Sequence, residues 1–212
     1  EMCNFAPHMK HIIFDLGNVL VRLDAEACRR AFQEAGMGTL VERSNNEART
    51  ILNQLGLGLI TAEEFCQKAR ELSGSQASYE AIYRAANAML VEIPDRKKRR
   101  LLELRAKGCH VYLLSNTNSI HWDYCSKQLF PYKGYTVADY FDRIFLSQEL
   151  HLQKPDPAIF HEALHQAGIQ PEETLFIDDL AENCEAAKSA GITAFQNKNF
   201  DDWEQAVDKY LL

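Results

Sequence analysis

Five short apolar segments recur along this chain, and stretches with helical periodicity separate them. The segments are HIIFD (11–15), CHVYLLS (109–115), RIFLS (143–147), TLFIDD (174–179) and the weaker ITAF (192–195). Each is almost continuously apolar, which is typical of a parallel strand that is covered on both faces. Because strand and helix alternate, we predict an α/β fold with a doubly wound parallel sheet and right-handed crossovers.

Glycine and proline mark the ends of the helices that we expect between these strands. The segments are 96–108, 157–168, 181–191 and 201–211. The first three end on a glycine, which is common just after a helix, and the second begins with a proline, which fits a first turn. The basic run RKKRR at 96–100 opens the first helix, and we expect it to form a solvent-exposed helix face.

The chain between the first two predicted strands is about ninety residues long, far more than a crossover needs. Helical periodicity recurs in it near 24–35, 45–55, 61–73 and 78–90. Thr61 and Glu64 have the spacing of a capping box, which marks a helix start. We predict two units: a core of residues 9–21 and 93–212, and a helical cap of residues 22–92 inserted over the C-terminal edge of the sheet.

Composition limits the classes of function. The chain is 46% hydrophobic and 25% charged, as in ordinary globular proteins. Its net charge of −7 argues against a nucleic-acid partner, and no apolar run is long enough to span a bilayer. Residues 1–8 lack the apolar region of a secretory signal, and we expect them to form a frayed arm. The six cysteines lack the spacing of a metal site, so we expect them to be reduced thiols in a cytoplasmic protein. We expect that protein to be a monomer or a homodimer.

Polar side chains follow four of the predicted strands. They are Asp15, Ser115, Asn116, Lys154, Asp178, Asp179 and Asn183. Ligands of such sheets bind at the carboxyl ends of the strands, so we expect these side chains to share one site. Mg²⁺ takes oxygen ligands, and with a lysine it offsets the repulsion between a phosphoryl group and a carboxylate. A carboxylate can then attack phosphorus and form an aspartyl-phosphate that water hydrolyses.

Four segments resemble, in order and spacing, the motifs of the haloacid dehalogenase-like (HAD) superfamily. They are FDLGNVL (14–20), LLSNTN (113–118), the lysine of QKPDPAIF (153–160) and FIDDLAEN (176–183). The closest patterns are those of bacterial glucose-1-phosphate phosphatases and of the N-terminal phosphatase domain of soluble epoxide hydrolase. The resemblance implies a Rossmann-like core with an early-inserted helical cap. It also implies Mg²⁺-dependent hydrolysis of a small phosphorylated metabolite, with a sugar phosphate as one candidate.

The resemblance assigns a role to each matching residue. Asp15 would be the nucleophile and a metal ligand, together with the backbone carbonyl of Gly17 and the carboxylate of Asp179. Lys154 would bridge Asp15 and the phosphoryl oxygens. Ser115 and Asn116 would bind phosphate. Asp178 and Asn183 would support the metal and phosphate ligands.

The first motif departs from the usual phosphatase pattern at Gly17, where that pattern has a second aspartate. The missing aspartate would act as general acid for the leaving alcohol, a role worth about 10²–10⁴-fold in rate. Three explanations are open. The substrate has a good leaving group, such as an anomeric sugar phosphate; the cap or an ordered water supplies the proton; or the protein binds phosphate without turnover, as a regulatory protein would.

Two further reactions of the superfamily also do without the second aspartate. Haloacid dehalogenases attack carbon without Mg²⁺, but their first motif carries a bulky residue and Gly-Thr, which DLGNV does not match. Phosphonatases use a cap lysine, and Lys68 is the only lysine in 22–92. The polar helix around Lys68 favours a solvated surface charge, so both reactions rank below phosphate ester hydrolysis.

Overall fold

A five-stranded parallel sheet forms the centre of the computed structural model, which describes residues 9–42 and 44–211. The expected N-terminal arm, residues 1–8, lies outside the described residues. The strand order is β5-β4-β1-β6-β7. The strands are β1 His11–Phe14, β4 His110–Ser115, β5 Arg143–Leu146, β6 Thr174–Asp178 and β7 Thr193–Gln196. The predicted doubly wound α/β fold is confirmed.

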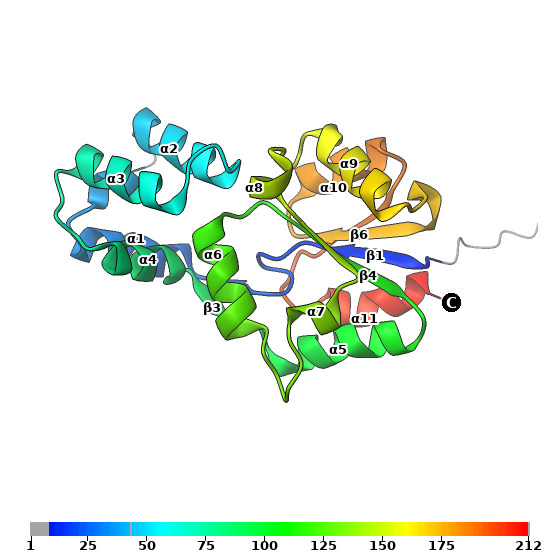
Figure 1. Ribbon diagram of the computed structural model, residues 1–212. Helices are drawn as coiled ribbons and strands as arrows, with labels where there is room; N and C mark the ends of the chain where they lie inside the picture. Colours follow the sequence, from blue (N-terminus) through cyan, green and yellow to red (C-terminus); the bar gives the residue numbers. More distant parts are fainter. Residues whose placement is uncertain (1–8, 43, 212) are drawn as a thin grey trace, which may run out of the picture.

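Helices cover both faces of this sheet, as Figure 1 shows. Side chains alternate along β1, so Phe14 joins the core beneath α5 (Asp95–Ala106), whereas Ile13 joins the core beneath α9 (Pro157–Ala167) and α10 (Ala181–Ser189). Full burial of each such side chain contributes about 1.5–3 kcal/mol. The two cores hold the strand ends, and the polar residues that follow them, at fixed positions.

Several short elements were not expected from the sequence. They are α6 Ser119–Tyr124, the π-helical turn η2 Cys125–Leu129, α7 Val137–Tyr140, α8 Ser147–Leu150 and the 3₁₀ turn η3 Pro171–Glu173. Asn118 caps α6 by accepting a hydrogen bond from the backbone N–H of His121. Asparagine is a common N-cap residue, so the sequence contained a signal for the start of this helix. The predicted helix 201–211 is shorter than expected: it consists of α11 Trp203–Ala206 and the 3₁₀ helix η4 Val207–Tyr210.

Four helices and one 3₁₀ turn follow β1. They are α1 Ala25–Glu34, η1 Gly38–Val41, α2 Asn46–Gly56, α3 Ala62–Ser73 and α4 Tyr79–Asn87, close to the ranges expected from periodicity. They enclose a hydrophobic cluster of their own, which includes Phe32, Phe65 and Ile82. The chain passes from the sheet domain to these helices at β2 (Arg22–Leu23) and returns at β3 (Leu90–Glu92), and these two strands form an antiparallel pair. We therefore propose the division into core and cap at residues 22 and 92.

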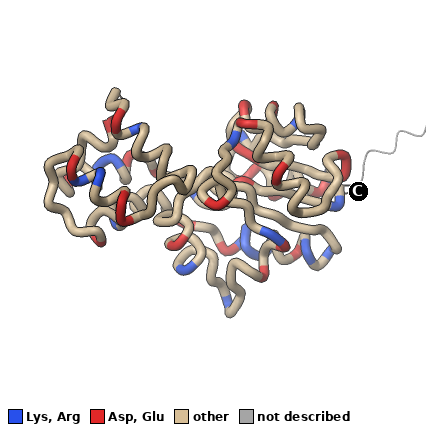
Figure 2. The backbone as a smooth tube through the Cα atoms, turned by 45° about the horizontal axis from the view of Figure 1, so that its top comes forward, with Lys and Arg blue, Asp and Glu red and all other residues tan. Residues whose placement is uncertain are grey.

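Charged residues of both signs alternate over the molecule. Figure 2 shows the Lys and Arg positions interspersed with Asp and Glu positions along the described chain. None of the helices in the described ranges combines the length and the apolar character that crossing a membrane requires.

The basic run at 96–100 is not a uniformly solvated face, so that prediction is wrong for Lys97 and Lys98, which are buried. The ammonium of Lys97 donates to the carbonyl of Val19 at 2.8 Å and to the carbonyl of Phe200. It also lies 3.8 Å from the centroid of the Phe200 ring. Desolvation lowers the pKa of Lys97 to about 8. A buried lysine of this kind ties α5 to the loop after β1 and to the C-terminal segment.

We expect Lys97→Met to lower the free energy of unfolding by about 1–3 kcal/mol, because it removes a charged donor from two backbone carbonyls. Urea denaturation measures the change. Lys107→Met is the matched control, since Lys107 has a side chain that is 57% exposed. Its effect should stay within about 0.5 kcal/mol. Equal losses in the two variants would contradict the structural role of Lys97.

Candidate functional site

The register of the sheet brings two carboxylates side by side. Phe14 on β1 pairs with Leu113 on β4 and with Ile177 on β6. The next residues, Asp15 and Asp178, therefore stand beside one another at the ends of adjacent strands. The backbone N–H of Asp15 donates to the carbonyl of Ile177 at 2.9 Å, which extends the ladder to the nucleophile candidate.

Lys154 links these carboxylates from the loop before α9. Its ammonium nitrogen lies 2.6 Å from Oδ1 of Asp15, 2.7 Å from Oδ2 of Asp178 and 3.0 Å from the carbonyl of Leu114. Lys154 is 4% exposed and Asp15 is 7% exposed. An ammonium group has three N–H donors, and here each has an acceptor. The lysine is therefore held in one orientation between two acidic strand ends.

The two adjacent aspartates after β6 have different environments. Asp178 is fully buried and accepts hydrogen bonds from the side chain of Asn183 at 3.0 Å to each oxygen and from the backbone of Leu180 at 2.9 Å. Asp179 is only partly buried and accepts a bond at 3.2 Å from Nδ2 of Asn18. Burial raises the pKa of Asp179. The carboxylate of Asp178 is thus fully used in hydrogen bonds within the protein, while the carboxylate of Asp179 can still accept further bonds at the site.

Asn18 is a site residue that the sequence analysis missed. Its φ of 51° lies in the left-handed region, which asparagine tolerates better than most residues. The buried side chain of Asn197 donates to the carbonyl of Asn18 at 3.0 Å and fixes this turn. The signal for Asn18 was its place directly after Gly17. Nothing local marked Asn197, which follows β7.

A side chain at position 17 would lie between the carboxylate of Asp15 and the side chain of Leu23. A Cβ atom at this position would be 2.9 Å from Cδ1 of Leu23 and 3.9 Å from Oδ2 of Asp15. Leu23 therefore packs over the position from which a second aspartate would reach the site. No acid group enters the site from residue 17.

The acidic cluster fits a hard cation. Asp15, Asp178 and Asp179 each offer a carboxylate oxygen, and these oxygens all lie within 4.8 Å of one another. Because Asp178 is engaged by Lys154 and Asn183, the oxygens left for an ion are Oδ2 of Asp15 and those of Asp179. An all-oxygen set with one or two carboxylates is what Mg²⁺ uses.

Ser115 is the last residue of β4 and Asn116 follows it, at the same edge of the sheet, and Ser115 is buried. The side chain of Asn116 donates to the carbonyl of Lys154 at 2.8 Å and accepts from its backbone N–H at 2.9 Å. The amide of Asn116 therefore holds the lysine loop. A phosphate contact from this residue would have to come from its backbone N–H.

Burial also sets the protonation of the central pair. Burial raises the pKa of Asp15 to about 7, although the charge of Lys154 opposes the shift. Burial alone would lower the pKa of Lys154, but the charges of Asp15 and Asp178 outweigh it and raise that pKa. The lysine is thus charged near neutral pH, while Asp15 is poised to give up its proton.

We expect the metal-free protein to lose stability as the pH rises from about 4 to about 7. In this interval the folded state keeps a proton on Asp15, whose pKa is raised to about 7, while the unfolded state has released it. Urea denaturation in a chelating buffer at several pH values measures the loss. Asp15→Asn lacks the titrating carboxyl and should give a flatter profile. Identical profiles would contradict the raised pKa.

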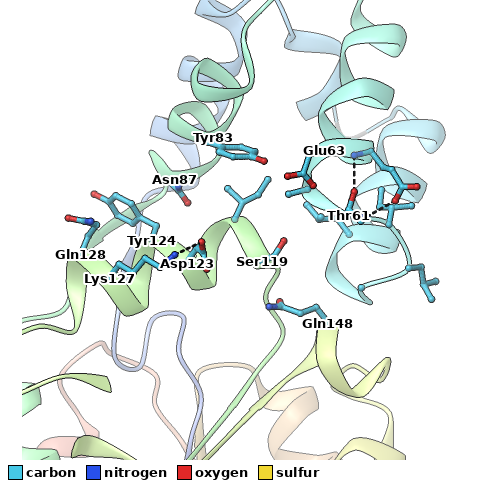
Figure 3. A pocket seen from close by; sticks show the side chains of 17 residues that line it. Thr61, Glu63, Tyr83, Asn87, Ser119, Asp123, Tyr124, Lys127, Gln128 and Gln148 are labelled. Carbon is cyan, nitrogen blue, oxygen red and sulfur yellow. Dashed lines mark hydrogen bonds and ion pairs between the residues drawn. The ribbon is translucent and has the colours of Figure 1, made fainter. Parts of the chain in front are cut away.

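A cavity of about 570 Å³ opens beside Asn116, between the cap helices and the core. Arg49 and Asn53 of α2 line it from the cap, and His121 and Gln153 line it from the core. A larger cavity, of about 800 Å³ (Figure 3), has none of the eight predicted site residues in its lining. The smaller one is the better candidate for a substrate because its lining includes Asn116, which directly follows β4 at the edge of the sheet that carries the site.

Known proteins are similar to this chain in sequence and in fold. The sequence matches the family of haloacid dehalogenase-like hydrolases over residues 9–191. It is 34% identical over 204 residues to the D-ribitol-5-phosphate phosphatase of Bacteroides thetaiotaomicron, covering 96% of this chain and 98% of that protein. The crystal structure of a HAD family enzyme from Bacteroides thetaiotaomicron has a TM-score of 0.91 at 41% identity and covers 94% of this chain and 98% of its own. That enzyme in complex with magnesium and inorganic phosphate has a TM-score of 0.83 at 41% identity, covering 89% and 93%. The resemblance seen in four short motifs is thereby confirmed, and the chain belongs to the haloacid dehalogenase-like hydrolase family.

Proposed function

We propose that this protein is a Mg²⁺-dependent phosphatase that hydrolyses a small phosphorylated metabolite through an aspartyl-phosphate on Asp15. The observation that carries this proposal is the arrangement around Lys154. The lysine holds Oδ1 of Asp15 at 2.6 Å, and no described side chain donates a hydrogen bond to Oδ2. A phosphatase among the relatives and a related structure that contains magnesium and phosphate support it.

The proposed chemistry has two displacement steps at phosphorus. A carboxylate oxygen of Asp15 attacks, the bond from phosphorus to the alcohol oxygen breaks, and the phosphoryl group is left on Asp15. Water then attacks phosphorus, and the free carboxylate and inorganic phosphate are released. The ammonium of Lys154 stabilises the charge on the phosphoryl oxygens in both steps. A bound Mg²⁺ would supply further charge neutralisation, with Asp15, Asp179 and the carbonyl of Gly17 as its proposed ligands.

The other site residues bind or position these groups in the proposal. The hydroxyl of Ser115 and the backbone N–H of Asn116 would bind the phosphoryl oxygens. Asp178 would orient Lys154, and Asn183 would in turn orient Asp178, to which it donates two hydrogen bonds. Rigid support of this kind keeps the nucleophile in line with phosphorus.

The lining of the cavity beside Asn116 favours a hydroxylated substrate. Arg49, Asn53 and Gln153 offer donors and acceptors to hydroxyl groups. We therefore propose a sugar or polyol phosphate. Because Gly17 supplies no acid, the leaving oxygen would take its proton from an ordered water or from the cap, or would leave unprotonated as the stabilised oxyanion of a hemiacetal. Residues 22–92 would close over the substrate and exclude bulk water.

A cytoplasmic location remains part of this proposal. The five described cysteines form no disulfide, which fits a reducing compartment. A monomer or a homodimer is compatible with the proposed site, since all of its residues come from one chain.

A panel of substrates tests the function. It contains ribitol 5-phosphate, glucose 1-phosphate and glyceraldehyde 3-phosphate, and a 2-chloroalkanoate and a phosphonate serve as controls. We expect release of inorganic phosphate from at least one phosphate ester only when Mg²⁺ is present. Halide release, or carbon–phosphorus cleavage, would instead support the two other reactions of the superfamily. Lys68, the residue that a phosphonatase would need, is exposed on α3 and does not line the cavity beside Asn116.

Silence over the whole panel at micromolar enzyme would favour the phosphate-binding regulatory protein. Trapping with beryllium fluoride separates that alternative from an enzyme whose substrate is missing from the panel. A stable Mg²⁺-dependent adduct on Asp15, absent in Asp15→Asn, requires a competent nucleophile. Absence of the adduct together with silence over the panel would overturn the proposed activity.

A further inference from the structure

The carboxylate of Asp179 depends on one side chain for its orientation. Nδ2 of Asn18 donates to Oδ2 of Asp179 at 3.2 Å, and no other described side chain donates a hydrogen bond to this carboxylate. The neighbouring carboxylate of Asp178 is instead bonded by both Lys154 and Asn183. The position of Asn18 therefore decides where the remaining acceptor capacity of Asp179 points.

The side-chain amide of Asn18 presents its nitrogen, and not its oxygen, to Asp179. Oδ1 of Asn18 accepts a hydrogen bond from the backbone N–H of Leu23 at 3.3 Å, which assigns the oxygen and leaves the NH2 group for the carboxylate. The φ of Asn18 is 51°, in the left-handed region. Residues other than glycine keep such a conformation only where their surroundings hold it. The turn at Asn18 is thus expected to need support from another segment.

Asn197, directly after β7, supplies this support. Asn197 is 1% exposed, and its Nδ2 donates to the carbonyl of Asn18 at 3.0 Å. Its Oδ1 accepts from the backbone N–H of Trp203 at 3.0 Å, which fixes the orientation of this amide as well. The backbone N–H of Asn197 donates to the carbonyl of Asp178 at 2.8 Å. Asn197 therefore bonds both to the turn after β1 and to the end of β6.

The preceding residue, Gln196, adds another link between the same segments. Its Nε2 donates to the carbonyl of Asp179 at 3.1 Å. The carbonyls of Asn18, Asp178 and Asp179 thus all accept hydrogen bonds from two consecutive residues at the end of β7. Although β7 is an edge strand and carries no proposed catalytic residue, it sets the spacing between the turn after β1 and the end of β6.

This spacing matters for a divalent cation. The carboxylates of Asp15 and Asp179 repel each other when both are charged, so they stay close only if the chain holds them there. Mg²⁺ requires nearly ideal octahedral geometry, with ligand oxygens at about 2.0–2.1 Å. Residues that orient metal ligands without touching the metal typically contribute about 10–100-fold to metal affinity.

We propose that Asn18 and Asn197 are positioning residues that set the affinity of the site for its divalent cation. Asn197 fixes the turn, and Asn18 fixes the carboxylate of Asp179. This inference rests on the proposed function, because it takes Asp15, Asp179 and the carbonyl of Gly17 as the cation ligands. Neither asparagine side chain contacts the cation or the substrate in this arrangement.

Titration of the full chain with Mn²⁺, without substrate, tests this role. Mn²⁺ prefers the same oxygen ligands as Mg²⁺, and the electron paramagnetic resonance signal of the free ion gives the dissociation constant without an activity assay. Asn18→Gly removes the amide, tolerates the left-handed backbone and should weaken binding about 10–100-fold. Asn197→Ala should weaken it about tenfold. Because both residues act through one turn, the double variant should lose less than the product of the two single losses.

Two controls separate positioning from a general loss of stability. Asn199→Ala removes an exposed amide of the same segment, one that is bonded to Asp202 and not to the turn, and should leave the dissociation constant unchanged. Leu164→Ala opens a cavity in the core beneath α9 and should lower the melting temperature without changing the affinity for Mn²⁺. All titrations are made at a temperature at which circular dichroism shows the variant to be folded.

The outcomes distinguish this inference from the proposed function. Wild-type affinity in either asparagine variant, or an equal loss in Leu164→Ala, would overturn the positioning role. Losses that simply multiply in the double variant would overturn the coupling through one turn. No Mn²⁺ binding by the wild type, or unchanged binding by Asp179→Asn, would overturn the proposed metal site itself. If Asn197→Ala does not fold, Asn18→Gly carries the test, because it leaves the buried Asn197 in place.

Discussion

Asp15→Asn is expected to reduce phosphate release by at least about 10⁴-fold, because the amide cannot form the covalent intermediate and a lost nucleophile removes the largest single catalytic effect. The fold should be kept. Asparagine has nearly the same volume, and its oxygen can still accept the hydrogen bond that Lys154 donates to Asp15 at 2.6 Å. Steady-state phosphate release and the circular dichroism spectrum measure the two expectations.

Asp201→Asn is the matched control for this substitution. Asp201 has a side chain that is 58% exposed, and it pairs with Arg96 and not with a residue of the acidic cluster. We expect wild-type activity in the control. Residual activity of Asp15→Asn above about a hundredth of wild type would show that another group attacks phosphorus.

Lys154→Met is expected to lower the free energy of unfolding by about 3–5 kcal/mol at neutral pH and to reduce the rate by about 10²–10³-fold. The substitution leaves Asp15 and Asp178 buried beside each other without the ammonium that lies 2.6 and 2.7 Å from them. An uncompensated buried carboxylate takes up a proton instead of staying charged. The stability loss should therefore shrink as the pH falls, which a purely steric effect of methionine would not do.

Urea denaturation at neutral and mildly acidic pH measures this pattern. Lys188→Met serves as control, since Lys188 pairs with Glu185 at 2.7 Å on the exposed side of α10. Exposed pairs contribute about 0–1 kcal/mol, so its effect should be small and nearly independent of pH. A pH-independent loss in Lys154→Met would contradict the electrostatic role of the lysine.

The sequence predicted the sheet and the strand ends well, because both depend on local patterns. Apolar runs of four to six residues marked β1, β4, β5 and β6, and the residues just after them were the polar ones that the structure brings together. The same reasoning was wrong at Lys97. A basic side chain in a basic run is normally expected to be solvated. Only the packing of α5 against Val19 and Phe200 shows that Lys97 is buried and that its ammonium group donates to their carbonyls.

Contacts between distant segments could not be predicted from the sequence, because local patterns do not show how the segments pack together. Asn197 fixes the turn at Asn18 across most of the chain length, and no spacing rule connects them. Asn116 was expected to bind phosphate, and the sequence did not show that its side-chain amide bonds to the backbone of Lys154. The cavity of about 800 Å³ forms only where the cap helices meet α6, so no single segment of the sequence predicts it.

The sequence by itself determined which residues stand at the strand ends and which chemistry they can perform, since periodicity and residue type are properties of short segments. Only the tertiary structure decided how the adjacent and chemically identical Asp178 and Asp179 differ. The chain sends the first toward Lys154 and Asn183 and the second toward Asn18. Lys154 and Asn18 lie on other segments of the chain, and a hydrogen bond of about 3 Å to either of them forms only once packing has brought those segments together.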